Sequence, residues 1–345
     1  MKMTILCAGP AAPHAGWVAI DELAFMLARL FDAELLSPMR LPPSLLERAT
    51  GRQRPRFAPL DCDGGDVLMV VAHSPSDLAM INAIPEVKKR FSRILGFVTD
   101  SYFQAGFLTE TTQYDAITVT AHEDAAPVQQ RFGIPVHQLY QGTDALSWTP
   151  MVPHARDIDL IAFGRTPPSY HQAFSHSFHQ AASPYLYLHS PLGHLSGSDV
   201  HLERGMLFKL LQRTRISLAF HLFVEPQGNR PRSMMVTSRW LESLTAGCIV
   251  AGKRPISRMA SDMLDWQGCT VELPDQADEA VDVLHDLLAQ HDQLQAQRQE
   301  NMRQMLLRHD WRYRIMHLCA LFDWPIPELL HQELGELQNL ASRLT

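Results

Sequence analysis

Short apolar runs, each followed by turn residues and a helical pattern, recur through roughly the first 145 residues and constrain the fold more than any other feature. Their composition fits strands that are buried on both faces of a sheet. Strands that alternate with helices in this way are typical of a parallel sheet covered by helices. The runs are Met3–Cys7, Asp66–Ala72, Ile94–Val98, Ala116–Thr120 and Val136–Leu139.

The same pattern restarts after a stretch that contains two prolines, TDALSWTPMVPHARD. We therefore expect an α/β protein with two Rossmann-like domains that face each other across a cleft. The predicted domains are residues 1–150 and 151–325, with a final helix over 326–345 that can pack back on the first domain. The strands expected in the second domain are Asp159–Phe163, Tyr185–His189, Ile216–Phe220, Cys248–Ala251 and Val271–Leu273.

The charge balance argues against binding to duplex nucleic acid. The 345 residues include 30 basic and 37 acidic side chains, a net charge of −7, whereas duplex binders usually carry a strongly basic domain. The five cysteines are odd in number and form no C-x-x-C pair, which predicts reduced thiols and a cytoplasmic protein. No stretch approaches the roughly 18 apolar residues of a membrane-spanning helix, so we expect peripheral membrane contact at most.

Two polar residues of the first half directly follow predicted strands, where parallel sheets bind their ligands. His73 comes after DVLMVVA, and Asp100 comes after ILGFVT. Either side chain could accept a proton from an acceptor hydroxyl or orient it, so both are candidate catalytic residues. The alternative is a local role, with His73 at a helix entry and Asp100 in a turn.

One helix of the second half has the features of an anion site. It is expected to begin near Thr237 or Ser238, and Arg239 lies in its first turn. Free N–H groups at a helix start and a guanidinium both suit a phosphate group. Glu242, one turn further on, could accept hydrogen bonds from a ribose diol. A capped helix with solvated charges is the alternative.

The helix and the residues that follow it read T-S-R-x-x-E-x-x-x-A-G-C, and this pattern resembles the nucleotide-binding helix of GT-B glycosyltransferases. More narrowly, it is similar to the C-terminal donor domain of the CgeB-like group, also called glycosyltransferase family 1 in a loose sense. The resemblance extends upstream through RISLAFH and downstream to HDWRYRI, so that it covers residues 159–320. The first half resembles these proteins only in layout.

The resemblance implies a metal-independent transferase that moves a sugar from a nucleotide-sugar donor to an acceptor hydroxyl, with no further cofactor. The acceptor would be a glycan, a lipid-linked molecule or a protein in bacterial glycan synthesis. Glu242 would bind the nucleotide ribose, and the backbone near Gly247 would approach the nucleotide. Gly164 and Arg165 resemble the loop that faces the diphosphate, where Arg165 would offset the charge that develops on the leaving group.

The chain departs from the pattern at the donor sugar. Many retaining members of this fold carry another glutamate eight positions before the counterpart of Glu242, where this chain has Met234. A retaining outcome is therefore not implied, although Thr237 and Ser238 could supply some of the missing hydrogen bonds. Two alternatives stay open: a nucleotide-sugar epimerase, and a non-catalytic subunit that binds a nucleotide or a partner.

Sequence patterns of other enzyme classes are missing. The chain has no G-x-G-x-x-G after the first strand, no G-x-x-x-x-G-K-[ST] and no G-x-S-x-G, which argues against dinucleotide oxidoreductases, P-loop enzymes and α/β-hydrolases. His171, His176 and His179 have helical spacing, but no Cys or H-E-x-x-H pattern accompanies them. We therefore predict no metal site, and interpret the D-C-D triplet at residues 61–63 as a polar turn.

Overall fold

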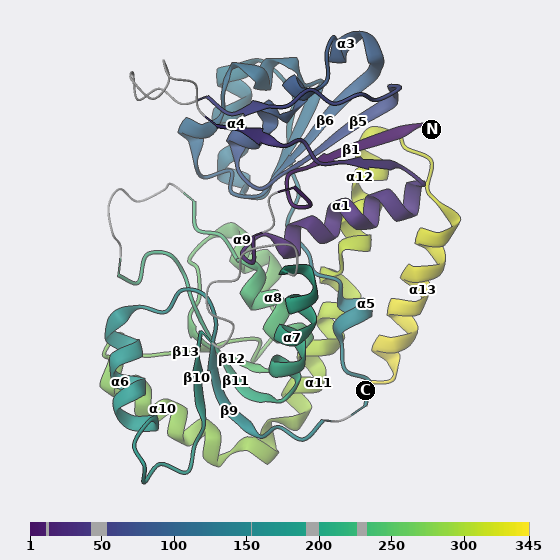
Figure 1. Cartoon of the computed structure of the whole chain (residues 1–345). Helices are drawn as coiled ribbons and strands as arrows, with labels where there is room; N and C mark the ends of the chain where they lie inside the picture. The colour runs from purple at the N-terminus through teal and green to yellow at the C-terminus, as the bar shows by residue number, and fades with distance from the viewer. Residues whose placement is uncertain (12–13, 43–53, 153, 191–199, 226–232, 345) are drawn as a thin grey trace.

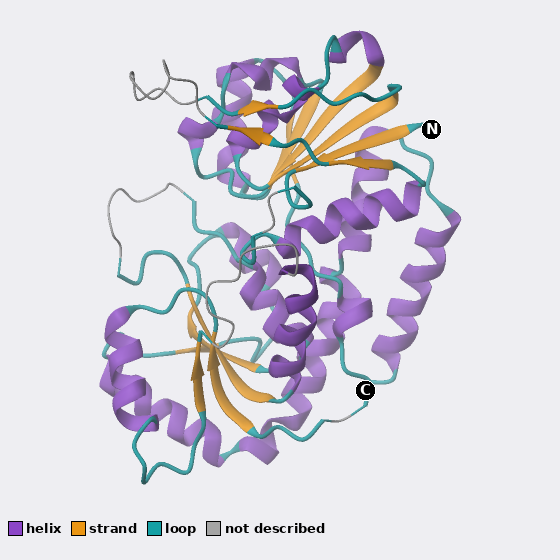
Figure 2. Ribbon diagram, in the orientation of Figure 1, coloured by secondary structure: helices purple, strands orange, loops and turns teal. Residues whose placement is uncertain are grey.

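The computed structural model describes residues 1–11, 14–42, 54–152, 154–190, 200–225 and 233–344, and it contains two α/β domains (Figure 1). Each domain is built around a parallel sheet with helices packed against it (Figure 2). This arrangement confirms the predicted fold class. Within the described part of the chain, no helix is long and apolar enough to cross a membrane. All five cysteines are buried and free.

The first sheet has six parallel strands in the order β2-β1-β5-β6-β7-β8. Its central strands β5 and β6 are buried over most of their length because helices cover both faces, as their apolar sequences predicted. The strands are β1 (Met3–Cys7), β2 (Glu34–Leu36), β5 (Gly65–Ala72), β6 (Phe91–Val98), β7 (Ala116–Val119) and β8 (Val136–Gln138), and a separate antiparallel pair is formed by β3 (Arg40–Leu41) and β4 (Arg56–Phe57). The helices are α1 (Val18–Phe31), α3 (Val87–Arg90), α4 (His122–Phe132) and the 3-10 helices η1 (Pro75–Ala83), η2 (Gln104–Gly106) and η3 (Thr109–Gln113).

The second sheet has five parallel strands in the order β10-β9-β11-β12-β13. A short helix, α5 (Ala145–Trp148), lies in the connection between the domains. The strands are β9 (Ile158–Ala162), β10 (Tyr187–His189), β11 (Thr214–Phe220), β12 (Ile249–Lys253) and β13 (Val271–Glu272). The helices are α6 (Pro168–Phe178), α7 (Val200–Gln212), α8 (Ser238–Thr245), α9 (Arg258–Met263), α10 (Ala277–Ala289), α11 (Gln295–Gln304), the 3-10 helix η4 (His291–Leu294) and the π-helical turn η5 (Met305–His309).

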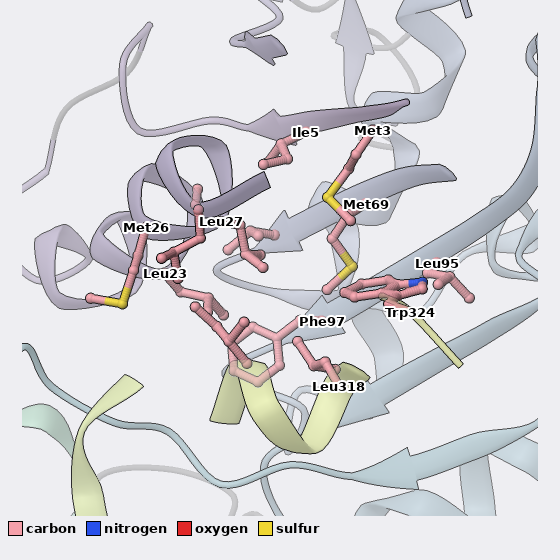
Figure 3. Close-up of a cluster of buried hydrophobic side chains, with 14 of the residues drawn as sticks. Met3, Ile5, Leu23, Met26, Leu27, Met69, Leu95, Phe97, Leu318 and Trp324 are labelled. Carbon is pink, nitrogen blue, oxygen red and sulfur yellow. The ribbon is translucent and has the colours of Figure 1, made fainter. Parts of the chain in front are cut away.

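The last two helices, α12 (Trp311–Phe322) and α13 (Glu328–Ser342), pack against the first domain, so the structure differs from the expected boundary at residue 325. Figure 3 shows Leu318 of α12 in one apolar cluster with Met69 and Phe97 of the first sheet. α13 spans both domains, since Leu330 lies in this cluster and Leu337 packs in a cluster of the second domain. Amphipathic periodicity predicted both helices but could not say which domain each one covers.

The carboxyl ends of the first sheet's strands face the second domain. Just beyond β7, the Thr120 hydroxyl lies 3.7 Å from the sulfur of Met235. At the start of α4, His122 Nε2 lies 3.1 Å from a guanidinium nitrogen of Arg258, which belongs to α9. This edge is where an open parallel sheet binds ligands, so the functional site is sought between the domains.

Candidate functional site

Asp100 lies just beyond the end of β6 and is held next to His73, as the strand order predicts. Its backbone N–H donates to the carbonyl oxygen of His73 at 2.9 Å, and the Tyr102 hydroxyl lies 3.4 Å from its Oδ2. Burial raises the pKa of Asp100 to about 7, although the Tyr102 hydroxyl, His73 and Arg165 all act to lower it. A carboxyl group with this pKa can hold or release a proton near neutral pH.

Arg165 comes from the opposite domain and is close enough to act electrostatically on Asp100. It follows Gly164 in the loop after β9, and both residues are exposed. Gly164 has a φ of +74°, and a Cβ at this position would collide with the guanidinium of Arg239. The positive φ therefore favours glycine here, and a larger residue would also displace the Arg239 side chain. The structure thus brings Gly164, Arg165 and Arg239 together, and it places Asp100 opposite them.

Arg239 lies in the first turn of α8, as predicted, and its side chain returns towards β9. Its Nη1 donates to the carbonyl oxygen of Arg165 at 3.2 Å, and its Cζ lies 5.7 Å from the centre of the Phe163 ring. Burial lowers the pKa of Arg239 to about 10. The charge of Arg165 adds to this shift, whereas the carboxylate of Glu242 opposes it. The guanidinium therefore remains charged at neutral pH beside a second cation, a combination that suits an anionic ligand.

The start of α8 has no side-chain cap. Thr237 is the N-cap residue and is exposed, and its side chain makes no capping hydrogen bond. Ser238 is the first residue of the helix and is partly buried. The first N–H groups of a helix have no partner within it, so they can donate to an anion bound between Thr237 and Arg239.

Glu242 lies one turn beyond Arg239, as predicted, but its side chain is less exposed to solvent than the sequence indicated. It is 4% exposed, and its Oε1 accepts a hydrogen bond of 2.5 Å from Nη1 of Arg204 in α7. The same guanidinium binds Glu22 of α1, with Nη2 at 3.0 Å from Oε2 and Nε on Oε1. Burial raises the pKa of Glu22, and Arg204 opposes that shift. Glu242 is therefore part of a contact between the two domains.

Gly247 lies at the opposite end of α8, away from Arg165 and Arg239. Its φ is +75°, and a Cβ there would lie 2.7 Å from Nη2 of Arg156 and 2.9 Å from the sulfur of Met302. The same Arg156 nitrogen donates to the carbonyl oxygen of Ala246 at 2.9 Å. The glycine thus ends the helix and lets α8 turn into β12.

His73 is at its predicted place after β5, but its side chain is buried and already engaged. Its Nε2 lies 2.7 Å from Oδ1 of Asp21, and its ring stacks on Trp17 at 5.2 Å. The Cys7 thiol donates to the same Asp21 oxygen at 3.2 Å. In the described part of the chain, Cys7, Asp21 and His73 are the set whose potential metal-ligand atoms lie within 4.8 Å of one another. The contacts between them are those of a hydrogen-bonded core group.

Several residues of this region gave no signal in the sequence analysis. Glu22 and Arg204 lie on amphipathic helices, where charged side chains are ordinarily solvated. Tyr102 lies two residues beyond Asp100. It could have been found if the search for candidate residues after each predicted strand had continued past the first polar residue. The partners of Glu22 and Arg204 come from distant segments, so no local pattern identifies them.

Two α/β domains with parallel sheets face each other, and the second carries the helix start at Thr237 and the cationic loop at Arg165. Residues 186–320 match a family model described as glycosyl transferase-like. This match lies within residues 159–320, the part of the chain whose sequence resembles glycosyltransferases. No curated protein matches the chain in sequence.

The chain also matches solved structures of glycosyltransferases, three of which follow. AviGT4, a glycosyltransferase involved in avilamycin A biosynthesis, is 13% identical, with 96% of this chain and 98% of that one covered and a TM-score of 0.48. The O-GlcNAc transferase of Thermobaculum terrenum is 11% identical, with 100% and 69% covered and a TM-score of 0.48. TarM of S. aureus is 10% identical, with 74% of this chain covered and a TM-score of 0.45, and the match spans 55% of the TarM chain.

Proposed function

We propose that this protein transfers a sugar from a nucleotide-sugar donor to an acceptor hydroxyl, with the donor on the second domain and the acceptor on the first. The observation that carries the proposal is the position of Asp100, whose pKa is about 7, opposite Arg165 and Arg239 of a domain with glycosyltransferase sequence. A proton acceptor on one side and cations on the other are what such a transfer requires.

The donor diphosphate is proposed to lie over the start of α8. There it meets the first N–H groups of the helix and the guanidinium groups of Arg165 and Arg239, with Thr237 and Ser238 beside it. When the bond from the sugar to the phosphate breaks, its electron pair goes to the diphosphate, and the two guanidinium groups stabilise the added charge. These cations supply the charge that a divalent metal supplies in other enzymes, so we propose that transfer needs no metal ion.

Asp100 is proposed as the base. Its carboxylate takes the proton of the acceptor hydroxyl while the acceptor oxygen forms the new bond to the sugar. Its pKa of about 7 leaves about half of the groups ionised at neutral pH, and it makes the carboxylate more basic than an ordinary aspartate. His73 is the less favoured candidate because its Nε2 already contacts Asp21. We assign it to the support of Asp100 through their backbone hydrogen bond.

The ribose is proposed to bind Glu242. The hydrogen bond with Arg204 uses Oε1 of this carboxylate, so the proposal assigns Oε2 to the ribose diol. Its low exposure means that neighbouring side chains must shift to admit the ribose. The acceptor is proposed to be a glycan, a lipid-linked molecule or a protein. This part rests on the resemblance alone.

Release of nucleoside diphosphate from a panel of nucleotide-sugars, with and without candidate acceptors, tests the proposal. A transferase gives acceptor-dependent release together with slow hydrolysis when no acceptor is present. Binding of a nucleotide-sugar without any release would instead favour the non-catalytic subunit, and interconversion of two donor sugars would favour an epimerase. Arg213, which forms an exposed ion pair with Asp157, provides a control arginine for variants of Arg165.

A further inference from the structure

The contact between α1, α7 and α8 is organised around the single guanidinium of Arg204. This group is 6% exposed and uses three of its nitrogens at once, Nη1 on Glu242 and the Nε and Nη2 pair on Glu22. Its Cζ also lies 5.0 Å from the centre of the Phe208 ring, one turn along α7. The two-nitrogen contact with Glu22 fixes the plane of the guanidinium, and this plane in turn fixes where Nη1 can meet Glu242.

The two carboxylates come from different domains. Glu22 belongs to α1, which packs on the first sheet, and Glu242 belongs to α8 of the second domain, the helix proposed to hold the donor. Figure 1 shows α1 extending across from the first domain to α7 and α8. The indole N–H of Trp148, in the connection between the domains, also donates to Oε1 of Glu22 at 3.3 Å. Residues of α1, of α7 and of the connection between the domains therefore meet at Glu22.

Stability is a poor explanation for this arrangement. The carboxylates and the guanidinium are all out of water, which is costly, and apolar residues of the same size often stabilise a fold as well as or better than such a group. What a buried, fully bonded charge group provides is a defined geometry, because its partners have few alternative arrangements. The geometry defined here is that of the Glu242 carboxylate.

We infer that Arg204 and Glu22 are positioning residues for the donor site: Glu22 orients Arg204, and Arg204 holds Glu242 in the orientation that receives the donor nucleotide. The inference rests on the proposed function, since it assumes that Glu242 contacts the donor. According to this inference, Glu22 of the first domain does not touch the nucleotide but controls how tightly the second domain binds it. The donor site is then complete only when the two domains are in this relative position.

Calorimetric titration of the full chain with nucleoside diphosphates tests the inference through the Glu22→Gln variant. The variant keeps the shape of the side chain but weakens its contact with Arg204. We expect affinity for the nucleoside diphosphate to fall about threefold to fivefold, less than in Glu242→Ala, because the carboxylate of Glu242 is still present and only its orientation is disturbed. In kinetic assays the KM for the donor should rise more than kcat falls, whereas Glu22→Asp should restore part of the affinity.

Arg29→Gln is the matched control. Arg29 lies two turns further along α1 and forms a similar two-nitrogen ion pair with Glu333, at 2.5 and 2.8 Å, away from α8. The Arg29→Gln variant should lower the melting temperature, as Glu22→Gln does, but it should leave nucleotide affinity unchanged. Equal affinity in wild type and Glu22→Gln, with only a lower melting temperature, would overturn the inference and leave a purely structural contact.

A double variant separates this inference from the proposed function. If Glu22 acts through Arg204 on Glu242, then Glu22→Gln combined with Glu242→Gln should bind no more weakly than Glu242→Gln alone. Losses that multiply would mean that Glu22 acts by another route and would refute the inference. Failure of the wild-type chain to bind any nucleoside diphosphate would instead refute the proposed function.

Discussion

Replacement of Asp100 by asparagine tests both the proposed base and the origin of its unusual pKa. Asparagine keeps the shape of the side chain but cannot take a proton from an acceptor hydroxyl. Loss of a general base typically lowers the rate by about 10²–10⁴-fold, so we expect kcat/KM of Asp100→Asn to fall within that range. In the wild type, kcat/KM should rise with pH and level off above about 7, because the ionised form is the active one.

The same variant should change the pH dependence of stability. Burial raises the pKa of Asp100 from 3.8 to about 7, so between these values the folded chain binds a proton that the unfolded chain has lost. Stability is therefore lost as pH rises through this window, and it is regained below it. From pH 5 to about 7 the loss is at most about 3 kcal/mol, at about 1.4 kcal/mol for each pH unit. Partial exposure of the carboxyl group reduces this to about 1–2 kcal/mol.

Urea unfolding at pH 5 and pH 8 measures this difference. Since asparagine does not ionise, the stability of Asp100→Asn relative to wild type should be greater at pH 8 than at pH 5. Asp63→Asn is the control, because the Asp63 side chain is 93% exposed and its replacement should have the same small effect at both pH values. Wild-type turnover in folded Asp100→Asn, or a stability difference that does not vary with pH, would refute the reasoning.

Three further predictions concern the donor side. Arg165→Ala should lower kcat by about 10²–10³-fold with an unchanged melting temperature, because Arg165 is exposed, whereas Arg213→Ala should retain wild-type kcat; a folded Arg165→Ala variant with normal kcat would contradict the diphosphate role. Glu242→Ala should weaken nucleoside diphosphate binding in calorimetry by at least about tenfold and Glu242→Gln by less; unchanged affinity in Glu242→Ala would defeat the ribose assignment. Transfer should proceed in EDTA without added magnesium or manganese, and activity that requires either ion would refute metal independence. Asp61 and Asp63 would not explain such a requirement, because they precede the amino end of β5, at the opposite edge of the sheet from Asp100.

The sequence predicted the fold well because most of its strands are buried on both faces. Runs such as VLMVVA, residues 67–72, have no polar positions that could compete with a strand assignment, and β5 is found there. Strand ends were equally predictable, since the first polar residue after a buried run must lie at the sheet edge. Asp100 was identified in this way, whereas Arg165 was identified through the resemblance. The two residues follow strands of different sheets, and the arrangement of the domains brings them within electrostatic range.

The partners of these residues could not be predicted, because they depend on how helices pack across the domains. The run AIDELAFMLARLF predicts an amphipathic helix, but the same periodicity would fit a solvated Asp21 and Glu22. In the structure Asp21 is fully buried against His73, and Glu22 meets a guanidinium 182 positions away. Local pattern carries no information about contacts at such separations.

Glu242 shows how a motif residue can be located correctly while its surroundings are not. The pattern T-S-R-x-x-E places Arg239 and Glu242 three positions apart, on one face of α8, and the structure agrees. A carboxylate on that face was expected to be open to solvent, but α7 and α1 cover it with Arg204 and Glu22. If Glu242 binds the ribose, one carboxylate then serves both the donor and the contact between the domains. A ligand that orders this carboxylate would also favour the domain arrangement in which Arg204 bonds to both of its partners.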